Sequence, residues 1–417
     1  MWVYYAHGRQ LMEQRLTASG FPARNFSDLF PCWLGARELL LHGRDPYSPE
    51  ITKEIQGGYY GRPIDSSRAT DPIDEQRFVY PLFVVFLLAP TVTLPFTLVQ
   101  SLFTALLFAA TVCTVLLWIR VLGLKIGRGK LFAWIVLTLA SIPFAEGIQL
   151  QQPGVLVAFF MAAAVYALAK EKFVVAGTLL AAAIMKPQLS AFLIGWVLLW
   201  TAVQWRTRKK VVIGFFSALA VLVVASEILL PRWPFEFVSN IAPYLRYTHA
   251  TTGIHELLGS VGGTMVLLLL AGVIVFAVWR SKFEPIDSDG FRLTISLVLV
   301  FTCLVIPSLA PHNQVVLVPA CLLLVKERKR IWANGRIARS LWLAGWLALA
   351  WPWVTGSILA TTLVFGRAVD RLWTLPFATN PLIPITIFAA LVLLVVRPSG
   401  VSRVPPLSSP LPPASST

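Results

Sequence analysis

Long apolar segments recur between residues 98 and 396, and they constrain the fold more than any other feature. Only 13% of the residues are charged and 57% are hydrophobic, whereas soluble proteins carry about 25% charged residues. The chain therefore cannot cover a globular surface facing water. The sequence predicts an all-α polytopic membrane protein with about 11 transmembrane helices. The expected segments are 98–120, 131–145, 155–170, 173–185, 189–204, 211–230, 263–280, 292–306, 315–326, 340–362 and 381–396. Several are shorter than the ~20 residues of a straight span, so we expect half-helices among them.

The distribution of basic residues predicts the orientation. The tail and the loops 120–130, 170–172, 205–210, 280–292 and 326–339 hold 21 of the 35 Lys and Arg but only five of the 20 acidic residues. By the positive-inside rule these loops face the cytoplasm. The N-terminal segment and the loops 146–154, 231–262 and 363–380 then face the exterior. Because no span precedes that first segment, we expect a first transmembrane helix to be missing upstream of Met1.

Three regions follow from this pattern. Residues 1–97 are expected to form an exterior segment: a polar and basic start (1–25), a helix, a polar loop (48–78), and an interfacial or re-entrant hairpin at 79–96, which contains three prolines. Residues 98–397 are the transmembrane helical domain. Residues 398–417, rich in Pro and Ser, are expected to be a disordered cytoplasmic tail.

Residues 26–47 predict a short amphipathic helix. Ser27 or Asp28 can cap its first turn with a side-chain oxygen, and Gly43 ends it. Its apolar side carries Phe30, Trp33, Leu34, Leu40 and Leu41. This exterior helix beside a membrane domain is the expected location of the functional site.

Several polar residues lie within or beside the apolar segments. Lys186 is the only cation between residues 173 and 205, and it either snorkels to the interface or has a partner. Glu146, Gln149, Gln151 and Gln152 form a polar cluster that either lines a cavity or forms hydrogen bonds between helices. The four cysteines show no metal-ligand spacing and are expected to be packing residues.

The polar motifs occur in a distinctive order. Asp28 precedes an aromatic helix, residues 43–47 read Gly-Arg-Asp-Pro-Tyr, and Tyr80 precedes Pro81. Further on, Gln152 and Gly154 open a span, Lys186 precedes Pro187, and His312 lies in a late exterior loop. Over residues 26–330 this order resembles glycosyltransferase family 87, a group of C-type membrane glycosyltransferases that use polyprenyl-phosphate sugars. The chain departs from the family pattern at Leu82, at Gln151 and at residues 253–256.

The resemblance implies transfer of mannose or a similar sugar from a polyprenyl-phosphate carrier to a glycolipid or glycan acceptor, with inversion. The reaction would take place on the exterior or periplasmic side of the cell membrane. Asp28 is then expected to be the general base, and Lys186 is expected to hold the leaving phosphate. Arg37, Arg44, Tyr80, Gln152 and His312 are expected to bind substrate. No organic cofactor and no nucleic-acid partner are implied, and a divalent metal ion is left open.

These assignments have alternatives, in which the residues have only structural roles or the protein is not a transferase. Asp28 can also be a helix cap, with or without a role in catalysis; if it is only a cap, Glu146 and then Glu256 are the next candidate bases. Arg37 and Arg44 often face water or headgroups in such positions. A polytopic transporter or lipid flippase would also have many spans and polar groups at membrane depth. Against it stand the long N-terminal segment with a candidate base and the lack of a visible internal repeat.

Overall fold

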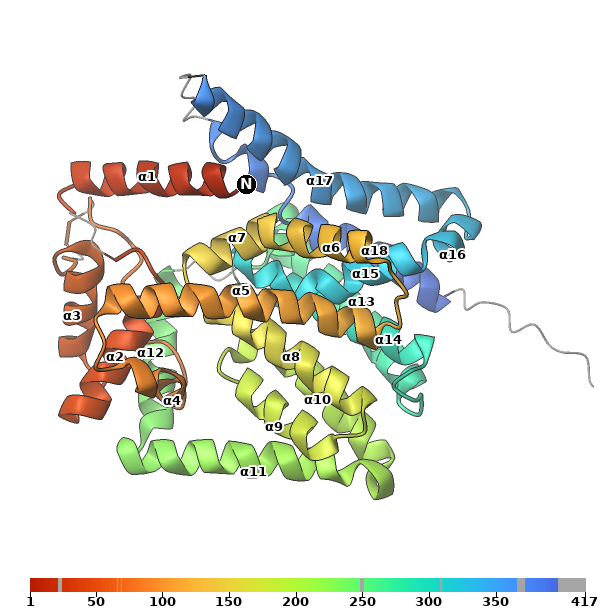
Figure 1. Cartoon of the computed structure of the whole chain (residues 1–417), viewed down its shortest axis with the longest axis horizontal. Coiled ribbons are helices and arrows are strands. Elements are labelled where there is room, and N and C mark those ends of the chain that lie inside the picture. The colour runs from red at the N-terminus through yellow and green to blue at the C-terminus, as the bar shows by residue number, and fades with distance from the viewer. Residues whose placement is uncertain are drawn as a thin grey trace, which may run out of the picture.

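The computed structural model describes residues 1–21, 25–65, 67–68, 70–247, 251–307, 310–365 and 372–396. The expected disordered tail, residues 398–417, lies outside this part of the chain. The described residues form α-helices and short 3-10 helices without a β-strand, which confirms the all-α prediction (Figure 1).

The helices of the apolar region form one bundle (Figure 1). Each of the eleven predicted segments overlaps at least one α-helix of this bundle, and 131–145 overlaps two. In chain order the helices are α5 (Phe96–Val121), α6 (Arg128–Ala140), α7 (Ile142–Gln149), α8 (Pro153–Ala169), α9 (Phe173–Ala183), α10 (Pro187–Val203), α11 (Trp205–Leu229), α12 (Trp233–Tyr247), α13 (Gly253–Ser281), α14 (Asp289–Val305), η2 (Pro311–Leu317), α15 (Val318–Lys326), α16 (Arg328–Ala333), α17 (Arg336–Val364), η4 (Leu375–Phe377) and α18 (Leu382–Val396).

Fewer helices than expected are long enough to cross a membrane alone. In the described residues five segments have the required length and apolarity: α5, α11, α13, α17 and residues 375–395. The pair α6 and α7, bent by 58°, makes a sixth if it counts as one span. The prediction of about 11 spans is therefore not confirmed. Helices α8, α9 and α10 have only 17, 11 and 17 residues, as expected for half-helices.

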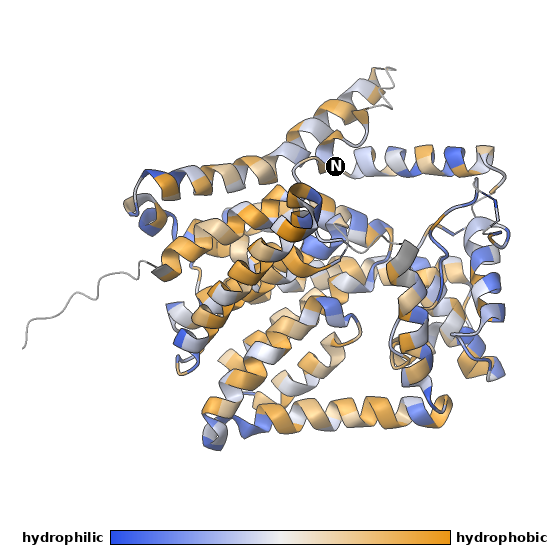
Figure 2. Ribbon diagram, turned by 180° about the vertical axis from the view of Figure 1, so that it is seen from behind, coloured by the Kyte–Doolittle hydropathy of each residue, from blue (hydrophilic) through white to orange (hydrophobic). Residues whose placement is uncertain are grey.

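The two ends of the bundle differ in character. The turns that carry the basic residues meet at one end, on the right in Figure 1, where Arg292 Nε donates to Val121 O at 2.9 Å. Helices α2, α3 and α12 lie at the other end, where Asn240 of α12 donates to Tyr47 O at 3.3 Å. Hydrophilic residues gather at both ends and hydrophobic ones between them (Figure 2). The structure thus brings together the two regions, 1–97 and 231–262, that the charge distribution assigns to one side.

The N-terminal segment is more helical than predicted. It contains α1 (Trp2–Ala18), α2 (Leu29–His42), α3 (Pro49–Tyr60), α4 (Val84–Leu88) and η1 (Ala89–Thr91). The prediction of a polar loop over residues 48–78 is wrong for α3. Ser48 caps this helix, because its hydroxyl oxygen accepts from Ile51 N at 3.3 Å. Pro49 occupies the first helical position, where its missing N–H costs nothing. Residues 79–96 form α4, η1 and the start of α5 rather than a full span.

Helices α9 and α11 touch backbone to backbone. A Cβ atom added at Gly177 would lie 2.2 Å from Val211 O, and one added at Gly214 would lie 2.3 Å from Val174 O. Small residues permit this close approach, which is a common way for helices to associate where water does not drive them together. The contact fixes α9, and with it the turn that carries Lys186.

We expect Gly177→Ala to destabilise the protein by about 1–3 kcal/mol, because the methyl group would overlap backbone atoms that cannot move independently. The measurement is the Tm of the purified protein in detergent. Gly195→Ala in α10 is the control, since nothing lies within 4 Å of that added Cβ atom. Equal Tm values for both variants would contradict the tight α9–α11 contact.

Candidate active site

The carboxylate of Asp28 takes no part in capping α2 within the described residues. Ser27 Oγ accepts from Leu29 N at 3.3 Å, and α2 ends at Gly43, which has a left-handed φ of 66°. Asp28 occupies the N-cap position, but its side chain makes no cap hydrogen bond within the described part of the chain. The cap interpretation of Asp28 is therefore wrong. Asp28 N donates to Leu150 O at 2.9 Å, which fastens the start of α2 to the turn before α8.

Gln152 joins Asp28 to Lys186. Its amide nitrogen donates to Asp28 Oδ2, and its amide oxygen accepts from Lys186 Nζ at 3.0 Å. The two partners allow only one orientation of the amide, since a carboxylate only accepts and an ammonium group only donates. Lys186 is 6% exposed, so the snorkelling alternative is wrong. Asp28 is half-buried.

Three helices begin at this site. Asp28, Gln152 and Lys186 are the N-cap residues of α2, α8 and α10. Helix N-termini carry partial positive charge and favour anions. Gly154 lies close to Lys186, since a Cβ atom added there would lie 3.4 Å from Lys186 Nζ and 3.2 Å from Leu189 Cδ1. The site thus combines one carboxylate with a buried ammonium group and three positive helix ends.

A second polar pair lies beside this chain of side chains. Glu146 of α7 accepts from His312 N at 2.9 Å, and His312 Nδ1 lies 3.7 Å from the same carboxylate oxygen. Tyr5 of α1 also reaches Glu146: burial first, then the charge of Glu146 and a hydrogen bond to it, raise the pKa of Tyr5 far above its usual value. The sequence did not single out Tyr5. Its only signal was a tyrosine pair, Tyr4–Tyr5, in a polar segment.

The electrostatics at Asp28 favour a base that titrates close to neutral pH. Burial raises its pKa from the ordinary 3.8 to about 6, and the charge of Asp74 raises it as well. His312, Lys186 and the hydrogen bond from Gln152 act in the opposite direction. Burial dominates because it disfavours the charged form. A carboxylate of this pKa is ionised at pH 7 and still binds a proton more readily than an ordinary one.

Other predicted residues lie away from this centre. The guanidinium of Arg37 lies 5.4 Å from the Trp33 ring, on the third turn of α2. Arg44 donates to Glu38 Oε2 at 2.9 Å and also pairs with Glu54. Tyr80 accepts at its backbone oxygen from the Tyr47 hydroxyl at 2.7 Å. Glu256 is exposed at the start of α13, with Thr251 as a partner at 3.3 Å. Their roles in substrate binding or catalysis stay predictions.

Comparison with known families decides the class of the protein. The family model described as Glycosyltransferase family 87 matches residues 78–307, more than half of the chain. The chain belongs to glycosyltransferase family 87. It is a multi-pass membrane glycosyltransferase, which makes the transporter alternative unnecessary. Comparison with curated proteins and with solved structures gives no match.

The family 87 match covers the site only in part. Tyr80, Gln152 and Lys186 lie within it, whereas Asp28 precedes it and His312 follows it. The structure connects Asp28 and His312 to the matched region. Gln152 donates a hydrogen bond to Asp28, and Glu146, which also lies inside the match, accepts one from His312 N. Among the described residues no three His, Cys, Asp or Glu side chains are grouped as a metal site would require.

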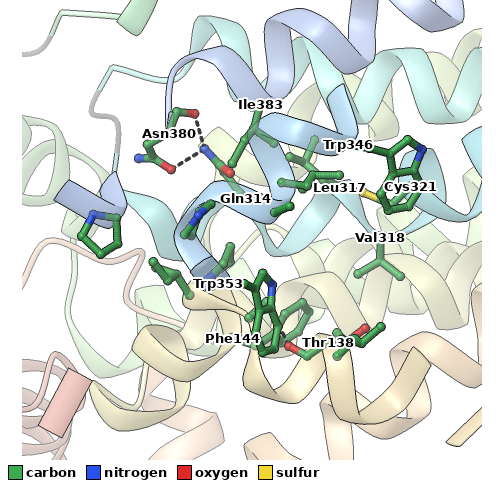
Figure 3. A pocket seen from close by; sticks show the side chains of 18 of the residues that line it. Thr138, Phe144, Gln314, Leu317, Val318, Cys321, Trp346, Trp353, Asn380 and Ile383 are labelled. Carbon is green, nitrogen blue, oxygen red and sulfur yellow. Dashed lines mark hydrogen bonds between the residues drawn. The ribbon is translucent and has the colours of Figure 1, made fainter. Parts of the chain in front are cut away.

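An apolar cavity of about 450 Å³ adjoins the candidate site (Figure 3). It lies between α6, α7, η2, α17 and α18, and its lining includes Phe144, Trp346 and Trp353. Its polar part is a side-chain pair in which Gln314 Nε2 donates to Asn380 O at 2.8 Å and to Asn380 Oδ1 at 2.6 Å. Helix α7 and η2 carry both this lining and the Glu146–His312 pair, so the cavity and the polar site are neighbours.

Proposed function

We propose that this family 87 enzyme transfers mannose or a similar sugar from a polyprenyl-phosphate carrier to a hydroxyl group of a glycolipid or glycan acceptor. The observation that carries the proposal is the Asp28–Gln152–Lys186 chain at the start of three helices. It brings a base and a cation together at one site. Displacement of a phosphate by a hydroxyl group needs both of these groups.

In the proposed reaction the acceptor hydroxyl gives its proton to the Asp28 carboxylate while its oxygen bonds to the anomeric carbon. The bond from that carbon to the phosphate oxygen breaks, and the electron pair leaves with the phosphate. The Lys186 ammonium group stabilises the charge that develops on the leaving phosphate. Because the acceptor attacks opposite the leaving group, the anomeric configuration inverts.

Two features support a lipid-linked donor. Helices α8 and α10 have 17 residues each and extend about 25 Å from the site toward the basic end, slightly less than the ~30 Å of a hydrocarbon core. The site then lies near the level of lipid phosphates. The apolar cavity offers a place for an isoprenoid chain: Leu137 and Val354 on its lining are 52% and 54% exposed, so it opens to the apolar outside of the bundle.

The proposal is tested with the purified enzyme in liposomes. Radiolabelled polyprenyl-phosphate mannose and polyprenyl-phosphate glucose are offered with a lipid extract as the source of acceptors, and GDP-mannose and UDP-glucose are offered in parallel. We expect label from one polyprenyl-phosphate sugar to appear in a product of inverted anomeric configuration. Use of a nucleotide sugar, or of neither polyprenyl donor, would overturn the proposal.

The activity should depend on pH through Asp28. A general base works in its ionised form, and the pKa of Asp28 is about 6. The transfer rate is therefore expected to rise with pH, to reach half its maximum near pH 6 and to level off above pH 7. The measurement is kcat/KM for the donor between pH 4.5 and pH 8. A half-maximum near the ordinary pKa of 3.8, or a flat profile, would contradict the assignment.

We propose that the site faces the exterior, as the basic loops indicate. In intact cells, Lys53→Cys in α3 and Glu236→Cys in α12 should react with a membrane-impermeant thiol reagent. Lys329→Cys in α16 should react only after permeabilisation. All three positions are exposed in the structure, so burial does not explain protection. The reverse labelling pattern would place the site in the cytoplasm.

A further inference from the structure

A polar cleft lies beside the turn between α7 and α8. Its volume is about 680 Å³, and it is bounded by α1, by the first turns of α5 and by this turn. The polar side chains that line it include Arg9, Gln10, Glu13, Gln100, Thr104 and Gln151. This lining contrasts with that of the apolar cavity and suits a hydrated ligand.

Helix α1 is held so that its polar side faces the cleft. Trp2, Ala6, Arg9, Gln10 and Glu13 line the cleft, and their spacing puts them on one side of a helix. The neighbouring side is anchored by Trp373: the Tyr4 ring stacks on it at 4.5 Å, and the Tyr4 hydroxyl donates to its backbone oxygen. Tyr4 is fully buried. The contacts of Tyr4 with Trp373 therefore fix the position of α1, and with it one wall of the cleft.

The floor of the cleft is formed by Gln151, the residue that precedes Gln152, the hydrogen-bond partner of Asp28. Gln151 has a positive φ of 51°, a strained conformation that persists only where the surroundings enforce it. Its amide donates to Thr104 Oγ1 at 3.1 Å and accepts from Gln100 at 3.1 Å, which ties it to α5. The next residue, Gln152, binds Asp28. Two consecutive glutamines thus serve the cleft and the carboxylate. From the opposite wall, Arg9 lies 6.0 Å from the ring of Phe26, two residues before Asp28.

The charges of the cleft favour an uncharged ligand with many hydroxyl groups. Arg9 pairs with Glu13 at 3.1 Å, so its positive charge is balanced. Amide groups, which both donate and accept, make up much of the remaining polar lining, and they match sugar hydroxyls, which do the same. A phosphate would favour an uncompensated cation, and among the residues that line this cleft the cation, Arg9, is already paired.

We infer that this cleft binds the carbohydrate part of the acceptor and presents one of its hydroxyl groups to Asp28. The inference rests on the proposed transfer reaction. It assigns the acceptor to the α1–α5 cleft, while the phosphate of the donor occupies the side of Lys186. Arg9, Gln10 and Gln100 would then determine which acceptor is used.

A binding experiment tests this without any turnover. Ser101→Cys places a thiol on the lining of the cleft at an exposed position, and its labelling rate is followed by mass spectrometry of the peptide that contains it. We expect at least one neutral glycoside among octyl mannoside, glucoside and galactoside to slow labelling, and inorganic phosphate to leave it unchanged. Protection by phosphate, or by no glycoside, would overturn the inference.

Kinetics separate the cleft from the donor site. Gln10→Leu is expected to raise the acceptor KM roughly tenfold, as for the loss of about one hydrogen bond, and to leave the donor KM unchanged. Gln14→Leu is the matched control, since it lies one turn further along α1 and outside the cleft lining. Equal acceptor KM values for the two variants, or equal effects on donor and acceptor, would contradict the assignment. Failure of the proposed function appears differently, as lack of polyprenyl-phosphate sugar use by the parent enzyme.

Discussion

Replacing Asp28 by Asn is expected to lower sugar transfer by about 10²–10⁴-fold, the usual contribution of a general base. An amide cannot take a full proton from the acceptor hydroxyl. The fold should survive the change, because the Asp28 carboxylate makes no cap hydrogen bond in α2, Leu29 N already donates to Ser27 Oγ, and an amide of nearly the same shape replaces the carboxylate. The measurement is the initial rate of transfer together with the Tm of the variant. Donor binding should remain close to that of the parent.

The control for this substitution is Asp45→Asn. Asp45 lies in the same segment and accepts from Tyr47 N at 2.8 Å, a bond that an amide oxygen also makes, so activity should be unchanged. Asp28→Glu should retain little activity, since one more methylene displaces the carboxylate from the reacting oxygen. If Asp28→Asn transfers sugar as fast as the parent, the base must be sought at Glu146, the next candidate base that the sequence indicated.

Sequence signals that involve a few neighbouring residues singled out two residues of the candidate site, Asp28 and Lys186. The bounds of α2 followed from a capping residue, Ser27 or Asp28, and from Gly43, and these signals placed Asp28 at a helix start. Lys186 stood out as a lone cation in an apolar stretch. Both signals concern a few neighbouring residues, whose propensities are decided before any tertiary contact forms.

Long-range pairing could not be predicted in the same way. Asp28 and Gln152 are 124 positions apart, and no periodicity in either segment specifies that they meet. Helix α1 was missed because it has no continuous apolar stripe. Its anchor is the contact between Tyr4 and Trp373, 369 positions apart. The number of spans stays unconfirmed, because apolar composition marks a buried segment without specifying that it crosses the whole bilayer.

Replacing Lys186 is the second change with a large expected effect. Lys186→Met keeps the length and apolar stem of the side chain but removes the charge, and should lower transfer about 10²–10³-fold, as for the loss of a group that stabilises a developing negative charge. Folding should be preserved, since a methionine suits a buried position and removes the cost of burying an ammonium group. The measurement is kcat and the donor KM, with the Tm as a check of folding.

Two further variants identify the cause of that loss. Lys186→Arg keeps the charge and should recover part of the activity, but not all of it, because the planar guanidinium differs from an ammonium group in shape and hydration. Lys172→Met is the matched control: Lys172 is also the N-cap of an apolar helix, α9, but is exposed at the opposite, basic end. If Lys186→Met transfers sugar as fast as Lys172→Met, the ammonium group only satisfies Gln152, and the leaving phosphate must be held by the helix N-termini alone.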